Sequence, residues 1–292
     1  MTGHPIPLQI QNLRKSYGSF QAVNDLSFVV NPGEVFGLLG PNGAGKTTTI
    51  SIITTLEKRT SGEVKVFGHD VTAESRQAKC KFGVVHQEVI NSGFFDLEEL
   101  LQFQSGYYGI RNNTKRIHEL LGRLGLFEHR HKKVKQLSGG MKRRLMIAKA
   151  LVHSPRLLLL DEPTAGVDLT LRENLWTFVQ ELRSEGIAVL LTTHYLEEAE
   201  LLCDRVGILN HGKLEACGPT SKIINQFAQK KIIVETRSAG RKEIMAKTDE
   251  VLGDILVASG IDPKDLLDVH VEEGRLEDAF RKLISAPMEA KP

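Results

Sequence analysis

A glycine-rich segment near residue 40 carries the residue types that bind phosphate. It fits the pattern G-x-x-x-x-G-K-[ST] and is followed by Thr48; its residues are Gly40, Pro41, Asn42, Gly43, Ala44, Gly45, Lys46 and Thr47. Glycines let backbone N–H groups curl around phosphate oxygens, and the N-terminus of a following helix adds a positive dipole. Lys46 can reach the outer phosphates of a nucleotide, and the Thr47 hydroxyl can bind Mg²⁺. The alternative is an ordinary glycine turn between a strand and a helix.

A second candidate for chemistry is the acidic pair Asp161 and Glu162, which follows four consecutive leucines. Such an apolar run predicts a strand buried on both faces, and open α/β sheets bind ligands at the carboxyl ends of their strands. Asp161 is placed to hold Mg²⁺ through water, and Glu162 is placed to orient and deprotonate an attacking water. Alone, this pattern more often marks a strand end that meets solvent. Downstream of a phosphate loop, it favours nucleotide hydrolysis.

The elements around these motifs predict an α/β fold. The phosphate loop lies between an apolar strand at Val35–Leu39 and a helix from Lys46 to about Leu56. Further strands are expected at Leu8–Leu13, Leu26–Val30, Phe82–Val85, Leu157–Leu160, Ile187–Thr192, Val206–Asn210 and Lys213–Ala216. Helices are expected at about 96–126, 139–152, 171–183 and 196–203. Because strands alternate with helices, the sheet should be mostly parallel, with an antiparallel part.

The pattern changes near Thr220, which predicts two domains. Residues 1–225 form the nucleotide-binding domain, with a helical subdomain at about 92–155, and residues 226–292 form a small α+β accessory domain. In the second domain, strands are expected at Lys231–Glu235 and Leu267–Val271. One face of a terminal helix is marked by Leu276, Ala279, Phe280, Leu283 and Ile284.

Composition and charge limit the kinds of partner that this protein can have. The net charge is only +2, and no basic patterning typical of a nucleic-acid binder is present. The sequence contains an odd number of cysteines, and they lie far apart: Cys80, Cys203 and Cys217. Neither a disulfide framework nor a zinc site is therefore expected. No apolar run approaches the roughly 18 residues that span a bilayer, and the first ten residues lack the features of a signal peptide. A role at a membrane would therefore need a separate spanning partner.

Several further motifs resemble those of the ABC ATPases. The segment 137–140, which contains Ser138, Gly139 and Gly140, resembles the family's signature motif and lies shortly before the acidic strand. Residues 165–168 resemble its D-loop. On its own, such a segment would be an ordinary N-capped start of a helix, with no role in function. After the phosphate loop and the acidic pair, the resemblance covers residues 8 to about 220 in the family's motif order.

Three single residues match this family by position. His194 follows a predicted strand, as the family's switch histidine does, and Gln87 follows Phe82–Val85, as its Q-loop glutamine does. Tyr17 lies where the family places an aromatic residue that stacks on adenine. Taken singly, each residue also has an ordinary structural explanation: a surface histidine, a loop glutamine and a half-buried aromatic residue in a strand.

The resemblance implies an ATP- and Mg²⁺-dependent ATPase subunit of a transporter, at the cytoplasmic face of the inner or plasma membrane. Two copies would bind ATP between the phosphate loop of one and Ser138–Gly140 of the other, and a multi-spanning permease would receive the motion. The implied catalytic residues are Lys46, Gln87, Glu162 and His194, and the implied metal ligands are Thr47, Gln87 and Asp161. The stretch Glu88–Ile110 would contribute to the groove for the permease, and no nucleic-acid partner is implied.

Within the family, the segments LSGGMKRRL and LLDEPTAGVD and the ending at Arg275–Phe280 resemble exporters of drugs and polysaccharides with separate membrane subunits. His86 stands where the family commonly has proline, and Met141 stands where glutamine is commoner. The run Lys142–Arg144 is predicted to be a solvated helix face. His129 and His131 lack a third ligand at a sensible spacing.

Three other functions compete with an exporter subunit. ABC ATPases that act on ribosomes typically carry two such domains in one chain, and those that act on DNA contain a long coiled coil; this sequence has neither. A P-loop kinase or GTPase would leave the LSGG segment and His194 unexplained, and no NKxD motif is present. Import rather than export stays open, although the sub-family resemblance favours export.

Overall fold

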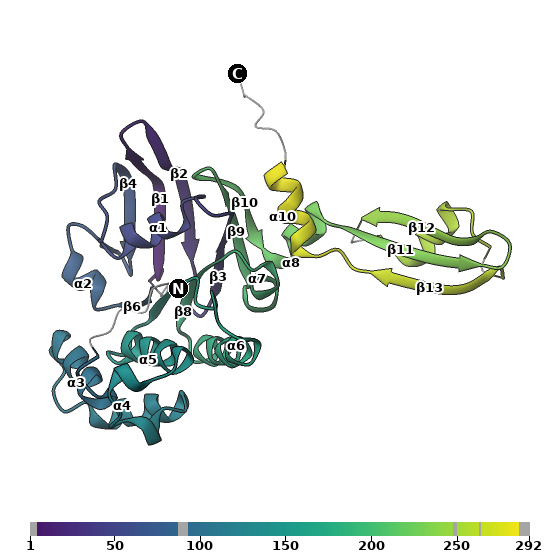
Figure 1. Ribbon diagram of the computed structural model, residues 1–292. Helices are drawn as coiled ribbons and strands as arrows, with labels where there is room; N and C mark the ends of the chain where they lie inside the picture. The colour runs from purple at the N-terminus through teal and green to yellow at the C-terminus, as the bar shows by residue number, and fades with distance from the viewer. Residues whose placement is uncertain (1–4, 87–92, 248–249, 263, 286–292) are drawn as a thin grey trace.

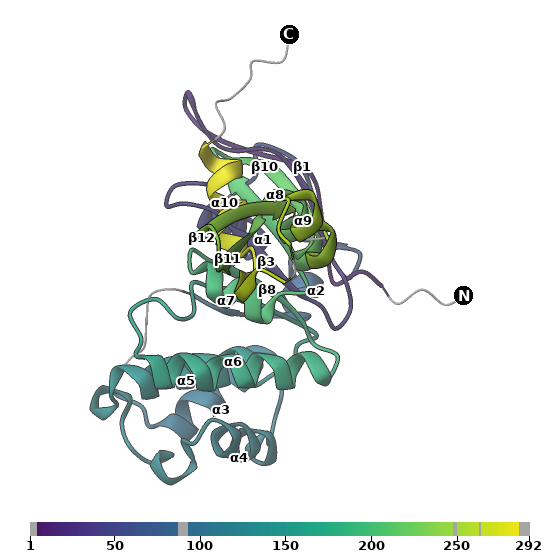
Figure 2. The ribbon, with the colours of Figure 1, turned by 90° about the vertical axis from the view of Figure 1, so that its right-hand side faces the viewer.

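The computed structural model describes residues 5–86, 93–247, 250–262 and 264–285. Two sheets and a layer of helices make up the body of the molecule, and a small third sheet extends from one side of it (Figure 1). In the second view, the helices α3 (Leu97–Tyr107), α4 (Thr114–Arg123), α5 (Gly139–Leu151) and α6 (Leu169–Ser184) lie together below the sheets (Figure 2).

A six-stranded sheet forms the centre of the body, in the order β10-β9-β3-β8-β7-β6. Its strands are β3 (Val35–Leu39), β6 (Phe82–Val85), β7 (Leu157–Asp161), β8 (Ala188–Thr193), β9 (Arg205–Asn210) and β10 (Lys213–Pro219). All neighbours are parallel except β9 and β10, which form a hairpin. Along β7, Leu158 and Leu160 enter one hydrophobic core, and Leu157 and Leu159 enter another. Burial on both faces explains the continuous apolar runs, and the predicted α/β fold is confirmed.

An antiparallel sheet in the order β2-β1-β4-β5 covers one side of this centre. Its strands are β1 (Leu8–Tyr17), β2 (Phe20–Val30), β4 (Ser61–Val66) and β5 (His69–Asp70). The predicted strands Leu8–Leu13 and Leu26–Val30 are only the apolar ends of one long hairpin. The polar end was missed because Lys15 is buried there, where its Nζ binds Glu57 Oε2 at 2.9 Å and the carbonyl of Lys58 at 2.8 Å.

Helices surround the parallel sheet and connect its strands. Besides the four named above, they are α1 (Lys46–Ile53), α2 (Ser75–Lys79) and α7 (Leu196–Leu202), with single 3-10 turns at Phe127–His129 and Val134–Gln136. The predicted helical stretch 96–126 is divided into α3 and α4. Gly109 and Asn112, at φ 72° and 56°, turn the chain between them, because a left-handed residue cannot continue an α-helix.

The C-terminal part consists of α8 (Thr220–Phe227), β11 (Gln229–Thr236), β12 (Gly240–Lys247), α9 (Leu252–Ala258), β13 (Leu266–Glu272) and α10 (Leu276–Ser285). Its three strands form an antiparallel sheet in the order β12-β11-β13, which packs with α9 around Ile232, Val234, Ala246 and Ile255. By contrast, α10 returns to the body beside α8 (Figure 1) and adds Leu276 and Ala279 to the body's core. The division into residues 1–225 and 226–292 stays a prediction, and it separates α10 from the core that α10 helps to fill.

The sequence predicted neither one strand of this part nor the packing partner of its terminal helix. The strand β12 carries charged residues at 241–243 and is mostly exposed, so it shows no alternating apolar pattern. The terminal helix was predicted, but its partner was not, because packing of α10 on α7 and α8 joins segments far apart in the chain. In the described part of the chain, no helix is long and apolar enough to cross a membrane.

We expect Gly83→Ala to destabilise the fold. A Cβ at Gly83 in β6 would lie 2.1 Å from the carbonyl oxygen of Ala150 in α5, so the helix would have to move away from the strand. Overpacking of this kind costs about 1–3 kcal/mol in the free energy of unfolding, which urea titration measures. Gly122→Ala in α4 is the control: a Cβ there meets nothing within 4 Å, so it should be neutral or stabilising. Equal stability of both variants would contradict the close packing of α5 on β6.

We expect His153 to make stability depend on pH. Its Nε2 lies 3.0 Å from the Phe82 carbonyl, its Nδ1 has no hydrogen-bond partner among the described residues, and burial lowers its pKa below the ordinary value of 6.5. The neutral ring therefore contributes stability that is present above about pH 6.5 and lost as pH falls through the folded-state pKa. Melting temperatures from about pH 8 to about pH 5 should fall more steeply for the natural protein than for His153→Gln. Parallel curves would contradict this assignment.

Candidate functional site

The phosphate loop connects β3 to α1, as its motif requires. Gly43 and Gly45 adopt φ of 81° and 108°, which side chains disfavour, and Gly45 forms the N-cap of α1. Neighbouring backbone also fills the space beside two glycines. A Cβ would lie 2.5 Å from the Ala22 carbonyl oxygen at Gly45, and 2.4 Å from the Leu209 carbonyl oxygen at Gly40. The loop is thus held in one curled shape, with the free amides of the first turn of α1 at its end.

Lys46 is the first residue of α1 and is only 4% exposed. Its Nζ donates to the carbonyl oxygens of Gly40 at 2.7 Å and Pro41 at 3.2 Å, and lies 3.4 Å from Glu162 Oε1. A buried ammonium needs such partners, because desolvation without them is costly. The loop carbonyls therefore hold the positive charge of Lys46 at the loop, facing the carboxylate that follows β7.

Glu162 has a second charged neighbour, since its Oε2 lies 3.2 Å from His194 Nδ1. His194 follows the end of β8, which pairs with β7, so the parallel order of the strands brings the two residues to one edge of the sheet. The predicted catalytic residues Lys46, Glu162 and His194 therefore meet in one cluster. The fourth, Gln87, lies outside the described residues.

The two described candidates for metal ligands also meet. Thr47 Oγ1 donates to Asp161 Oδ1 at 3.4 Å. The same carboxylate oxygen accepts a shorter bond, of 2.6 Å, from Thr192 Oγ1 in β8. Thr192 was missed, because it lies inside an apolar strand and only strand order shows that its hydroxyl reaches Asp161. A hydroxyl and an oriented carboxylate are hard oxygen ligands of the kind that Mg²⁺ prefers.

These groups open onto a pocket with a volume of ≈ 480 Å³, which is lined by Tyr17, Phe20, Ala22, Asn42, Gly43, Ala44, Gly45, Lys46, Thr47, Thr48, Glu162, Ala165 and His194. Its rim is aromatic: Tyr17 is 45% and Phe20 62% exposed, and Lys15 Nζ lies 4.4 Å from the centre of the Tyr17 ring. Phe20 had not been predicted. It faces Tyr17 across the β1–β2 hairpin. A phosphate cradle at one end and exposed rings at the other fit a nucleotide.

The segment that resembles the signature motif lies elsewhere. Ser138 is the N-cap of α5, where its Oγ accepts a hydrogen bond from the Met141 N–H at 3.3 Å. Neither Ser138 nor Gly139 or Gly140 is among the residues that line the nucleotide-shaped pocket. Within one chain, the predicted nucleotide contacts are therefore not all brought together.

Two buried charged residues support the acidic pair and had not been predicted. Arg143 in α5 is 4% exposed and donates to the carbonyls of Glu162 and Pro163, so the prediction of a solvated face is wrong for it. Glu198 in α7 accepts from Trp176 Nε1 at 3.1 Å and from Thr164 Oγ1 at 3.2 Å, and burial raises the pKa of its carboxyl. Both residues fix the segment that follows Glu162.

Comparison with known proteins agrees with this geometry. Residues 23–165 match a family model described as ABC transporter. The linearmycin resistance ATP-binding protein LnrL of Bacillus subtilis (strain 168) is 42% identical over 233 residues, which cover 79% of this chain and 75% of that protein. The Nod factor export ATP-binding protein I of Burkholderia orbicola (strain AU 1054) is 37% identical over 300 residues, which cover 97% of this chain and 98% of that protein.

A solved structure of the ATP-binding subunit of an ABC transporter has a TM-score of 0.70 and 31% sequence identity, and the match covers 75% of this chain and 92% of that one. The similarity thus extends from sequence to fold, and two named relatives are themselves ATP-binding proteins. The chain belongs to the ABC transporter family, as an ATP-binding subunit with the ATPase domain that powers transport.

Proposed function

We propose that this chain drives an exporter by hydrolysing Mg²⁺-bound ATP between two copies of itself. The observation that carries the proposal is the position of Glu162, whose carboxylate lies 3.4 Å from Lys46 Nζ and 3.2 Å from His194 Nδ1. A carboxylate fixed at the edge of a nucleotide pocket can accept the proton of an attacking water. The names of the relatives, which refer to Nod factor export and linearmycin resistance, support the direction of transport.

In this mechanism, Lys46 and the loop amides bind the phosphates, and Tyr17 stacks on the base. Glu162 orients the water and accepts its proton, while His194 holds the carboxylate and contacts the terminal phosphate. Thr47 and Asp161, with Gln87 by family resemblance, would hold Mg²⁺, which neutralises charge on the phosphate oxygens when bound. Phosphoryl transfer depends almost entirely on such positioning and charge stabilisation.

The second copy supplies what the pocket of a single chain lacks. Ser138 and the amides of Gly139 and Gly140 begin α5, and a helix N-terminus binds phosphate well. Because these residues do not line the pocket of their own chain, a head-to-tail homodimer accounts for both halves of the site. ATP would close such a pair, and hydrolysis would reopen it.

The partner is a multi-spanning membrane subunit, and the chain lies on the cytoplasmic face of the inner or plasma membrane. Exposed aromatic side chains support a docking surface at the start of α3: Phe94 is 82% exposed, and Phe95 packs edge-to-face on Phe103 at 4.7 Å. Beside them is a hollow of ≈ 330 Å³, lined by Asp96, Glu98, Glu99, Gln102, Phe103 and His131. An apolar and acidic surface of this kind suits a cytoplasmic helix of the membrane subunit.

We also propose that the accessory domain within residues 226–292 dimerises or regulates the ATPase. Its sheet has its own core around Ile232 and Val234, and α10 and α8 connect it to the body. A sheet fixed to the body at one end can meet a second copy without disturbing the nucleotide pocket.

We expect Glu162→Gln to lower kcat for ATP by about 10²-fold or more, because the water loses its base. ATP binding should persist, so gel filtration with ATP should give a stable dimer. Glu215→Gln is the control, since Glu215 is exposed in β10 and away from the pocket. Turnover by Glu162→Gln close to that of the natural protein would refute the role of Glu162.

The same variant tests the partner. Tagged Glu162→Gln, recovered with ATP from detergent-solubilised membranes, should bring a multi-spanning membrane protein with it, and recovery should fall without ATP. Ribosomes or nucleic acid in place of a membrane protein would refute the transporter assignment and leave the ATPase chemistry standing.

We expect Thr192→Val to raise the Mg²⁺ concentration for half-maximal ATPase activity by about 10-fold, because a group that orients a metal ligand tunes its affinity. Thr220→Val is a matched control: that hydroxyl is also buried and also bonded at 2.6 Å, but to the Cys203 carbonyl. An unchanged Mg²⁺ requirement in Thr192→Val would show that the 2.6 Å bond to Asp161 does not prepare a metal site.

A further inference from the structure

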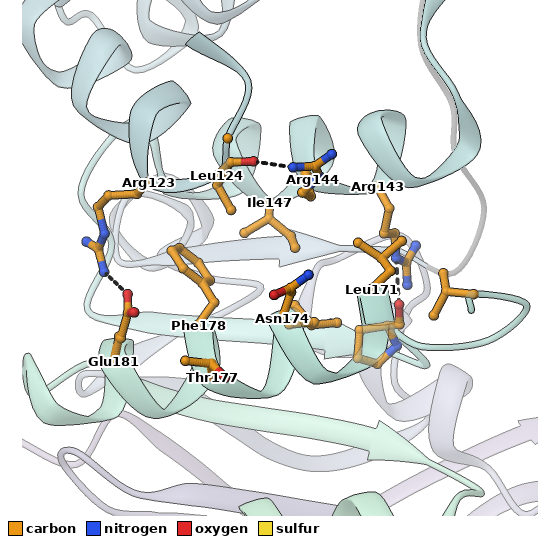
Figure 3. Close-up of a pocket in the computed structure, with 14 residues that line it drawn as sticks. Arg123, Leu124, Arg143, Arg144, Ile147, Leu171, Asn174, Thr177, Phe178 and Glu181 are labelled. Atoms are coloured by element: carbon orange, nitrogen blue, oxygen red, sulfur yellow. Dashed lines mark hydrogen bonds and ion pairs between the residues drawn. The ribbon is translucent and has the colours of Figure 1, made fainter. Parts of the chain in front are cut away.

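The Arg143 side chain points from α5 toward the loop that follows β7, at one end of a pocket of ≈ 320 Å³ between α5 and α6 (Figure 3). Among the described residues, its guanidinium donates to three backbone carbonyls: Nη1 to His86 at 2.7 Å, Nε to Pro163 at 2.8 Å and Nη2 to Glu162 at 3.0 Å. His86 follows β6, and Glu162 and Pro163 follow β7. One side chain of α5 therefore fixes the ends of two adjacent strands.

Burying a guanidinium in this way is unfavourable unless its donors are used. Desolvation lowers the pKa of Arg143, and the charges of Asp161 and Glu198 oppose that change. Arginine suits the position because its planar fork can donate several hydrogen bonds in fixed directions at once. A lysine ammonium would reach the same space as a single point charge.

The backbone of Glu162 explains why such a support is needed. Glu162 has φ of 46°, a left-handed conformation that side chains disfavour and that persists only where neighbours enforce it. Its N–H donates to the carbonyl oxygen of Thr192 at 3.0 Å and lies 3.1 Å from that residue's hydroxyl. Its C=O accepts from Arg143. The peptide groups on both sides of Glu162 are thus fixed by different elements, β8 and α5.

We propose that Arg143 is a positioning residue for ATP hydrolysis, whose guanidinium holds the backbone of Glu162 so that the carboxylate points into the nucleotide pocket. The inference rests on the proposed role of Glu162 as the base. Because Ser138 is the N-cap of α5, the Arg143 side chain joins the helix of the signature segment to Glu162 and to the carbonyl of His86. A displacement of α5 is then transmitted to the carboxylate within one chain.

The test is steady-state ATPase kinetics of Arg143→Gln and Arg143→Lys in the full-length protein. We expect Arg143→Gln to lower kcat by roughly 10- to 100-fold, since small misplacements of a catalytic group have effects of this size. KM for ATP should change less than about two-fold, because Arg143 does not line the nucleotide pocket. Arg143→Lys should recover part of kcat, since its ammonium can still donate to one or two of the carbonyls.

Arg144→Gln is the matched control. Arg144 is the next residue of α5, and its Nη1 also donates to a backbone carbonyl, but to that of Leu124 at 2.8 Å, which follows α4 (Figure 3). It should lower the melting temperature as Arg143→Gln does, while kcat stays within about two-fold of the natural value. A loss of kcat equal to that of Arg143→Gln would assign both effects to stability and overturn the proposal.

A double-mutant cycle separates positioning from an independent role. If Arg143 acts through Glu162, single-turnover hydrolysis by Arg143→Gln/Glu162→Gln should be no slower than by Glu162→Gln alone. Additive losses of the hydrolysis rate in the double variant would overturn the proposal. A natural kcat in both Arg143→Lys and Arg143→Gln would also overturn it. If Arg143→Gln does not fold, a natural kcat in Arg143→Lys alone would do so. If Glu162→Gln itself hydrolyses ATP at the natural rate, the proposed role of Glu162 as the base fails. That result differs from one in which only the positioning role of Arg143 fails.

Discussion

The site depends on keeping one ammonium and two carboxylates together at a buried edge of a parallel sheet. Lys46, Asp161 and Glu162 are all less than a tenth exposed, so each must find partners within the protein. The strand order β3-β8-β7 supplies them, because the phosphate loop follows β3, His194 follows β8, and the acidic pair lies at the carboxyl end of β7. The leucines of β7 fill both cores, so the register of the strand, and with it the position of the acids, is fixed by packing.

Much of this arrangement could be predicted from the sequence, because each motif is a contiguous segment directly after an apolar strand. The phosphate loop, the acidic pair and His194 were identified in this way, and they meet. Thr192 and Arg143 were not, since a hydroxyl within a strand and a cation within a basic run acquire their roles only through contacts across the fold. Strand ends were misjudged where a buried polar residue, such as Lys15, interrupts the apolar pattern.

Close packing of α5 on the sheet determines what its side chains can reach. Gly83 has no Cβ, so the backbone of α5 at Ala150 lies directly on β6. The first turns of the same helix then pass the ends of β6 and β7, where Arg143 meets the carbonyls. Gly83 in β6 and Arg143 in α5 are 60 positions apart in the chain, and both help to align α5 with the ends of β6 and β7.

The chain leaves the body to form the accessory sheet and returns to the body at the same place. A Cβ at Gly274 would lie 2.8 Å from both the Ala228 Cβ and the Gln229 carbonyl oxygen, so the first and last residues of this excursion touch. Beyond it, α10 is fastened by the Leu276 N–H, which donates to Glu200 Oε2 at 2.9 Å. In topological terms, residues 229–273 are a loop insertion between α8 and α10. Because the two ends of this segment touch, a short connection between α8 and α10 would span the same gap and leave Leu276 and Ala279 in the core.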